Sequence, residues 1–510
     1  MKDSSGSLFS RVRAAMAGEL EALSAAAPTG LPTATADAFE LAVRALRYFA
    51  VDAREQVRVA EIDRVTGGDE DARSLAALAA GRMARAAFLR FDANELAVWI
   101  DLLASLDVAA ATAPLAASQG WSAALAGNAA QIRESAETLK REASARSWPN
   151  EVIEATVLKA LGASIEGDSP EAIRLARQAS RMSRTESLPQ EEYLANLVLA
   201  RLRRLDGKPH LSARILSALL RVATPPWHPW MCWELLLAGV GPEVSTPAAD
   251  ALTAALHAAS AGDEATMNTN LAAAERCVEG FHSLSKDLEV LRALLRGNHE
   301  SFSVGKAHQV PRGLGALALL PGEDRDAAYV LADPSVVRRV LAPGLALRQH
   351  PLLPPAKQRQ ARTETAIATL LLAGPEGMPE DIFFADVYGF AFQERHRNVR
   401  NVLYHRVRER LGEAANLTRG EGRVAIKAVR PLAAPDPRCS PPPEHSLLLV
   451  LAARGFASPR DAADALGIPM RTVQDALKRL AADGACRTVK KGRKLEYHLE
   501  DTTFLEPTRV

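Results

Sequence analysis

The chain has few aromatic residues and few cysteines. Aromatic side chains make up 5% of its 510 residues, and the cysteines are Cys232, Cys277, Cys439 and Cys486. These cysteines lie far apart and show neither the CxxC pattern nor the Cys/His spacing of metal ligands, so the sequence supports neither a disulfide framework nor a zinc site. We therefore expect no bound metal and a reducing, cytoplasmic location.

Long apolar runs are absent as well. No uninterrupted apolar stretch reaches the roughly 18 residues that a membrane span needs. The first 23 residues, MKDSSGSLFSRVRAAMAGELEAL, are amphipathic and contain acidic residues, whereas a signal peptide has a basic start and a continuous apolar segment. We expect neither a secretory leader nor a membrane role.

The common catalytic motifs are also missing. The sequence contains no GxxxxGK[ST] phosphate loop, no GxSxG elbow, no HExxH motif and no GxGxxG placed between a strand and a helix. We therefore expect the protein not to be an enzyme and to need no cofactor.

Alanine, leucine, arginine and glutamate dominate long stretches of the chain, and these residues favour helices because they lose little rotamer freedom there. At 510 residues and 48% hydrophobic, the chain can bury several cores, and about three domains are expected. The formal net charge is only +1, so any strongly basic surface must be local.

Glycine-centred breaks divide the first 300 residues into helical segments. Gly127, Gly167 and Gly207 are spaced 40 residues apart, and a further break lies at Gly262. Amphipathic helices follow these breaks, as at 170–180 and 210–220. Such helices bury their apolar stripes by stacking in pairs, so the period predicts a repeat array with an extended concave surface.

This pattern resembles the tetratricopeptide-type (TPR-like) repeats found in large bacterial transcription regulators. The runs EGDSPEAIRLARQASRM and EEYLANLVLARLRRLDGK carry the resemblance, which is good over 110–300 and weak over 36–110. It implies a concave face that binds a protein or peptide partner, or a small effector. Trp227, Trp230 and Trp233 could form a ligand cage, but we favour packing between helices because tryptophan is highly buried on average.

After residue 308 the periodicity changes. We predict a small antiparallel sheet at 312–348, then three helices and a hairpin, at 358–374, 379–390, 395–412 and 417–429. This order of elements resembles the OmpR/PhoB-type winged helix over residues 312–432. The segments ETAIATLLLAG, IFFADVYGF and NVLYHRVRERLG resemble its first, second and third helices.

The third of these helices carries many arginines and is the expected DNA-recognition helix. We predict a buried stripe of Val399, Val402, Leu403, Val407 and Leu411. The residues then expected to face the major groove are Arg397, Arg400, Asn401, Tyr404 and Arg408. Arg419 and Arg423 flank the turn of the hairpin and are expected to contact the DNA backbone as a wing. The competing interpretation is a winged helix used only for protein contacts.

A proline-rich segment at 433–443 predicts a semi-rigid linker. Beyond it, three helices and a hairpin turning at Gly492 are expected, with Ser458 as N-cap and Pro459 at the first position of the second helix. The pattern resembles the compact winged helix-turn-helix of MarR-like regulators over 444–501.

The third helix of this region is a second expected recognition helix. We predict a buried stripe of Val473, Ala476, Leu477 and Leu480. Base contacts are expected from Arg471, Thr472, Gln474 and Lys478. Phosphate contacts are expected from the hairpin residues Lys490, Lys491, Arg493 and Lys494.

The sequence thus predicts a mostly α protein: an α-helical repeat (TPR-like) superhelix followed by two small α/β winged-helix domains. The expected boundaries are 1–307 for the repeats, 308–432 for the first winged helix, 433–443 for the linker and 444–510 for the second. The expected function is a DNA-binding transcription regulator that binds double-stranded DNA, with a homodimer as a further hypothesis. The alternatives are a structural scaffold and a replication initiator.

Overall fold

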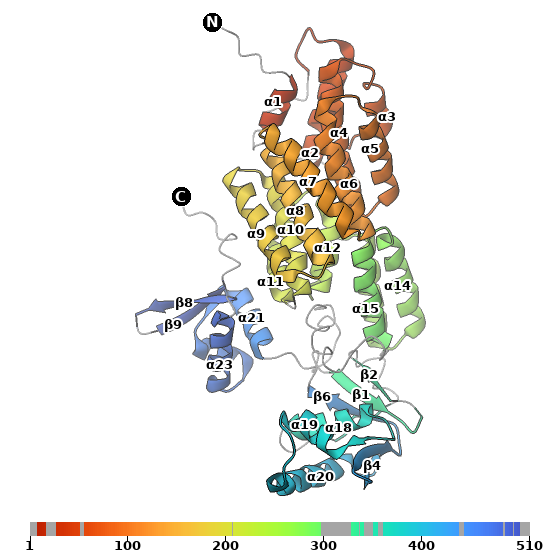
Figure 1. The fold of residues 1–510 in the computed structure, drawn as a ribbon, viewed down its shortest axis with the longest axis vertical. Helices are drawn as coiled ribbons and strands as arrows, with labels where there is room; N and C mark the ends of the chain where they lie inside the picture. The colour runs from red at the N-terminus through yellow and green to blue at the C-terminus, as the bar shows by residue number, and fades with distance from the viewer. Residues whose placement is uncertain are drawn as a thin grey trace. The chain divides into compact units, whose positions relative to one another are not determined.

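The computed structural model describes the following residues: 8–16, 27–50, 56–206, 208–296, 328–335, 337–340, 350–354, 361–437, 443–482, 485–492 and 494–499. The chain is mostly helical, with a few small antiparallel sheets toward its C-terminus (Figure 1). The contacts within the chain divide it into two compact parts. One lies within residues 1–250 and 273–286, and the other lies within residues 251–272 and 287–500. Among the described residues, no helix has both the length and the apolar character needed to cross a bilayer.

The first part of the chain is an array of helices, which we call the helical array. Its elements are α1 (Leu8–Ala15), α2 (Thr33–Ala50), α3 (Val59–Asp63), α4 (Glu70–Leu89), α5 (Ala93–Ser105), η2 (Ala109–Ala111), α6 (Thr112–Ala126), α7 (Ala129–Ala145), α8 (Pro149–Ile165), α9 (Ser169–Thr185), α10 (Pro189–Leu205), α11 (Pro209–Leu220), η3 (Pro225–Trp227) and α12 (His228–Leu237). Each even-numbered helix from α4 to α10 contacts the next even-numbered helix, and each odd-numbered helix from α5 to α11 packs on its neighbours in the chain. Further helices follow as α13 (Pro247–Ala261), α14 (Glu264–Val278) and α15 (His282–Arg296).

The 40-residue spacing is repeated in the helix boundaries. Helices α9 and α10 each begin and end 40 residues after α7 and α8, and α11 begins 40 residues after α9. Gly127 and Gly167 adopt the left-handed conformation that terminates a helix, and the next residue in each case, Asn128 or Asp168, caps the helix that follows. Gly207 lies outside the described residues. The breaks seen in the sequence are therefore helix C-caps followed directly by N-caps.

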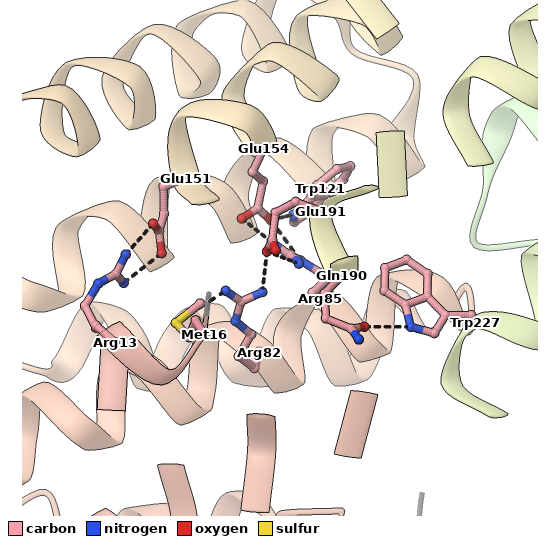
Figure 2. A network of polar contacts seen from close by, with 10 residues as sticks. All are labelled: Arg13, Met16, Arg82, Arg85, Trp121, Glu151, Glu154, Gln190, Glu191 and Trp227. Atoms are coloured by element: carbon pink, nitrogen blue, oxygen red, sulfur yellow. Dashed lines mark hydrogen bonds and ion pairs between the residues drawn. The ribbon is translucent and has the colours of Figure 1, made fainter. Parts of the chain in front are cut away.

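The core of the helical array contains buried ion pairs that the sequence analysis missed. Arg82 Nη1 and Arg85 Nη1, both on α4, donate to the same oxygen of Glu191 at 3.0 and 3.1 Å (Figure 2). Arg85 also pairs with Glu154, whose Oε1 accepts a 2.6 Å hydrogen bond from Trp121 Nε1. Burial alone would raise the pKa of Glu191, but the charges of Arg82 and Arg85 outweigh it and lower that pKa. These pairs connect α4 to α8 and α10.

A second buried group surrounds Glu234 on α12. Arg204 Nε donates to Glu234 at 2.6 Å, Arg201 pairs with the other oxygen, and Trp230 Nε1 lies 3.3 Å from that oxygen. Burial would raise the pKa of Glu234, but the two arginines lower it to about 2. Trp227, Trp230 and Trp233 are fully buried, which confirms the prediction that they pack between helices.

The middle unit, residues 328–437, consists of two small sheets and three longer helices. Its elements are β1 (Ala328–Ala332), β2 (Val337–Val340), α18 (Ala361–Leu372), β3 (Met378–Pro379), α19 (Glu380–Tyr388), η5 (Glu394–His396), α20 (Arg397–Leu411), β4 (Ala415–Gly420), β5 (Arg423–Ala428) and β6 (Leu432–Asp436). One antiparallel sheet has the order β2-β1-β6 and the other has the order β3-β5-β4. The three helices and both sheets contribute to one apolar core.

Strand β6 corrects the predicted start of the linker at residue 433. Its residues pair with β1, and Pro435 lies opposite Tyr329. Because β6 is an edge strand, a proline without an N–H group is tolerated there. The predicted sheet at 312–348 is present in part as β1 and β2, while residues 312–327, 336 and 341–348 lie outside the described part of the chain, as do linker residues 438–442.

The C-terminal unit, residues 443–499, follows the order expected from the sequence. Its elements are α21 (Pro443–Arg454), β7 (Phe456–Ala457), α22 (Pro459–Leu466), α23 (Met470–Ala482), β8 (Cys486–Lys491) and β9 (Lys494–Leu499). The short strand β7 was not predicted, and it completes a sheet of order β7-β9-β8. The middle unit has the same succession of helix, short strand, two helices and hairpin. In both units the short strand pairs with the second strand of the hairpin, β3 with β5 and β7 with β9.

We predict that Glu234→Gln lowers the free energy of unfolding by about 3–5 kcal/mol, because it removes the carboxylate from two buried guanidinium groups. Chemical denaturation of the full chain, followed by circular dichroism, measures this change. The matched control is Glu171→Gln, whose partner Arg174 is exposed and whose effect should stay within about 0.5 kcal/mol. Equal effects of the two substitutions would contradict the prediction.

A second prediction concerns acid. The pKa of Glu234 is about 2 in the folded chain, whereas an unfolded glutamate has a pKa of roughly 4.3. The stabilisation is therefore complete above the unfolded value and is lost as the pH falls toward the folded one. Thermal unfolding between pH 6 and pH 3 should show a smaller pH dependence for Glu234→Gln than for the unmodified chain. Parallel curves would show that this carboxylate does not contribute.

Candidate nucleic-acid interface

Helix α20 of the middle unit buries a different stripe from the predicted one. Leu403, Tyr404, Val407 and Leu411 are buried, while Val399 and Val402 are 42% and 49% exposed. The prediction that Tyr404 faces outward is therefore wrong, as is the predicted burial of the two valines. Tyr404 is 2% exposed and stacks on Phe383 with ring centroids 6.0 Å apart, because the larger aromatic side chain fills this part of the core. Burial, with the nearby charge of Glu380, raises the pKa of Tyr404.

Two of the predicted DNA-contacting arginines are paired with one carboxylate. Glu380, the first residue of α19, accepts from Arg400 Nη1 at 3.0 Å and from Arg419 Nε at 2.5 Å. Only 16% of the Arg400 side chain and 17% of the Glu380 side chain are exposed, against 38% for Arg419. The guanidinium of Arg400 lies over the ring of Phe392, and that of Arg419 lies over Tyr404. Arg400 thus does not belong to the outward face of α20.

The outward face of α20 carries other side chains. Asn401 and Arg408 are exposed as predicted, together with His405 and Arg406, which the sequence analysis did not select. Arg397 is exposed and lies 3.4 Å from Glu394. The signal that could have identified this face is the spacing of Leu403, Val407 and Leu411, because it fixes the rotation of the helix.

The turn between β4 and β5 offers less free positive charge than expected. Glu421 and Gly422 occupy the turn in left-handed conformations. Arg423 donates to the backbone carbonyls of Glu376 and Gly377, so its guanidinium binds the end of the loop before β3. With Arg419 paired to Glu380, both predicted wing arginines make contacts within the middle unit.

Helix α23 of the C-terminal unit matches its prediction closely. Val473, Ala476, Leu477 and Leu480 form the buried stripe. Arg471, Gln474 and Lys478 are exposed and Thr472 is half-buried. Among the residues that the structure describes, Arg471 and Lys478 form no ion pair. These side chains are available to a ligand.

The β8–β9 hairpin adds further positive charge to the C-terminal unit. Lys490, Lys491 and Lys494 are exposed, and Lys491 on β8 lies opposite Lys494 on β9 at the turn formed by Gly492. Lys491 Nζ also lies 3.8 Å from Glu496. Arg493 lies outside the described residues. Arg487 on β8 is exposed and was not selected from the sequence.

Ser458 is the N-cap of α22, as predicted, and it forms a capping box with Asp461. The Ser458 hydroxyl accepts from the Asp461 backbone N–H at 3.2 Å, and the Asp461 side chain accepts in return from Ser458. The hydrogen bonds from Ser458 lower the pKa of Asp461. This cap sets the beginning of the helix that precedes α23.

Comparisons of the chain with protein-family models, with curated proteins and with solved structures found no match. The case for a function therefore depends on the arrangement of residues in the middle and C-terminal units.

We predict that Ser458→Ala lowers the free energy of unfolding by about 1 kcal/mol, because the first turn of α22 loses its side-chain acceptor. Thermal unfolding of the full chain measures the change. Ser458→Asp supplies another N-cap acceptor and should recover most of the stability. If the Asp variant were as unstable as the Ala variant, the cap would not be the cause.

Proposed function

We propose that this protein is a sequence-specific DNA-binding transcription regulator, in which the C-terminal unit is the principal reader of double-stranded DNA. The observation that carries the proposal is the exposed face of α23, with Arg471, Gln474 and Lys478, in a unit whose β8–β9 hairpin also exposes lysines. A helix fits the major groove, arginine and lysine recognise guanine, and glutamine recognises adenine. The hairpin lysines supply the phosphate contacts that dominate affinity.

The shared order of elements in the two small units supports a tandem of winged helices. In each, a helix precedes a short strand, two helices follow, and a hairpin pairs with the short strand. Two DNA-binding domains joined by a short linker bind more tightly than either alone, because the second binds at high effective concentration once the first is bound.

The helical array is proposed to be a TPR-like superhelix that senses or recruits a protein or peptide partner. The 40-residue spacing of its helix boundaries and the stacking of alternate helices support this assignment. A cytoplasmic location and a homodimer that reads paired half-sites complete the proposal.

A structural scaffold is the second candidate. The observation that favours it is the pairing of Arg400 and Arg419 with Glu380, which leaves the middle unit less positive than the sequence suggests. In that case the middle unit would contact protein.

The test is binding of the full chain to a library of duplex DNA across a salt series. We predict that Arg471→Ala weakens binding to the selected sequence by about 1–3 kcal/mol and lowers the base preference at one position. Lys490→Ala should weaken binding to all sequences alike and reduce the slope of the salt dependence by about one. Arg174→Ala, on an exposed face of α9, removes the same charge and should change neither quantity. If the full chain bound no duplex at 50 mM salt, the scaffold would become the better candidate.

A further inference from the structure

The two expected recognition helices expose different chemistry. On α23 the outward side chains include Arg471 and Lys478, which suit guanine. On α20 the outward side chains include Asn401, Val402 and His405, while Arg400 lies on the inner side of the helix. The two helices therefore present different base-recognition groups.

Glu380 holds one arginine of α20 away from the exposed face of the helix. Its carboxylate pairs with Arg400 and Arg419, and its backbone N–H donates to Gly422 O at 2.9 Å in the turn of the hairpin. The residue before it, Pro379, pairs with Arg423 in the sheet. One residue at the start of α19 therefore contacts both α20 and the hairpin between β4 and β5.

The Arg400–Glu380 pair is well shielded from water. Both side chains are less than one-fifth exposed, and the Arg400 guanidinium lies 4.6 Å from the centre of the Phe392 ring. A shielded pair of this kind resists disruption, because removing one partner leaves a poorly solvated charge. Arg400 is consequently unavailable to a guanine edge.

Two of the exposed side chains of α20, Asn401 and Val402, are of the kinds that recognise A·T base pairs. An asparagine can donate to and accept from adenine with both atoms of its amide, and an apolar side chain can contact the methyl group of thymine. Asn401 and Val402 are adjacent and exposed. Val402 is 49% exposed and does not belong to the core of the middle unit. Arg406 is one turn after Val402 and Arg408 two turns after Asn401, so both exposed arginines can contact phosphates beside these residues.

We infer that α20 reads A·T base pairs through Asn401 and Val402, and that Glu380 is the positioning residue that prevents Arg400 from reading guanine. This inference rests on the proposed DNA-binding function. The binding site of the chain is then composite, with an A·T element bound by the middle unit and a guanine-containing element bound by the C-terminal unit.

The experiment is selection of the full chain on a randomised duplex library, with sequencing of the retained DNA. The unmodified chain should enrich a site with both elements. Asn401→Ala should reduce discrimination at an adenine of the A·T element by about 5- to 150-fold, and Val402→Ala should relax a neighbouring thymine. Neither variant should change the guanine-containing element, which Arg471→Ala should weaken. Asn401 and Val402 are exposed, so these variants should fold.

Glu380→Gln tests the positioning role. It should introduce a guanine preference within the A·T element and steepen the salt dependence by about one to two phosphate contacts, because two arginines become available. A loss of structure alone would not produce a new base preference. Glu413→Gln is the control, since its pair with Arg430 is highly exposed and its selected site should be unchanged.

The outcomes separate the inference from the proposed function. If the guanine-containing element is recovered but the Asn401 and Val402 variants leave the rest of the site unchanged, α20 does not read A·T pairs and the inference is overturned while DNA binding stands. If Glu380→Gln folds and adds no guanine preference, the positioning role is overturned. If no element is recovered for the unmodified chain, the proposed function fails with it.

Discussion

A guanidinium that leaves water needs a carboxylate within hydrogen-bond distance, because an unpaired charge in a protein interior costs several kcal/mol. In the helical array this requirement ties α4 to Glu154 and Glu191, and it ties Arg201 and Arg204 to Glu234. In the middle unit the same requirement directs Arg400 toward Glu380 and away from the surface. An arginine therefore adds to the exposed positive surface only where no buried acid competes for it.

This competition explains why counting basic residues overestimates the positive surface of the middle unit. The segment 395–412 is rich in arginine, yet Arg400 is paired below the surface and Arg397 lies near Glu394. The C-terminal unit has fewer arginines in its helix, but Arg471 and Lys478 face outward without an ion pair among the described residues. Local availability of charge, more than its total, distinguishes the two units.

Much of the fold could be predicted from the sequence, because its strongest signals are local. The 40-residue spacing gave the helix boundaries around Gly127 and Gly167, and the spacing of Val473, Leu477 and Leu480 gave the correct face of α23. On α20, however, the burial of Tyr404 was missed, since it depends on contacts with Phe383 and Glu380, which come from another helix. Strand β6 was missed for the same reason: its partner β1 lies about a hundred residues away in the sequence, and Pro435 argued against a strand.

The ion pairs of the helical array bear on how the array can unfold. In an ideal array each repeat contacts only its neighbours, so the ends can fray while the centre stays folded. Here Glu191 on α10 pairs with Arg82 and Arg85 on α4, across the intervening helices α5 to α9 in the chain. Separating α4 from α10 therefore leaves buried charges on both helices without their partners. The array should behave as one cooperative block, which would carry a perturbation at one helix to another several repeats away.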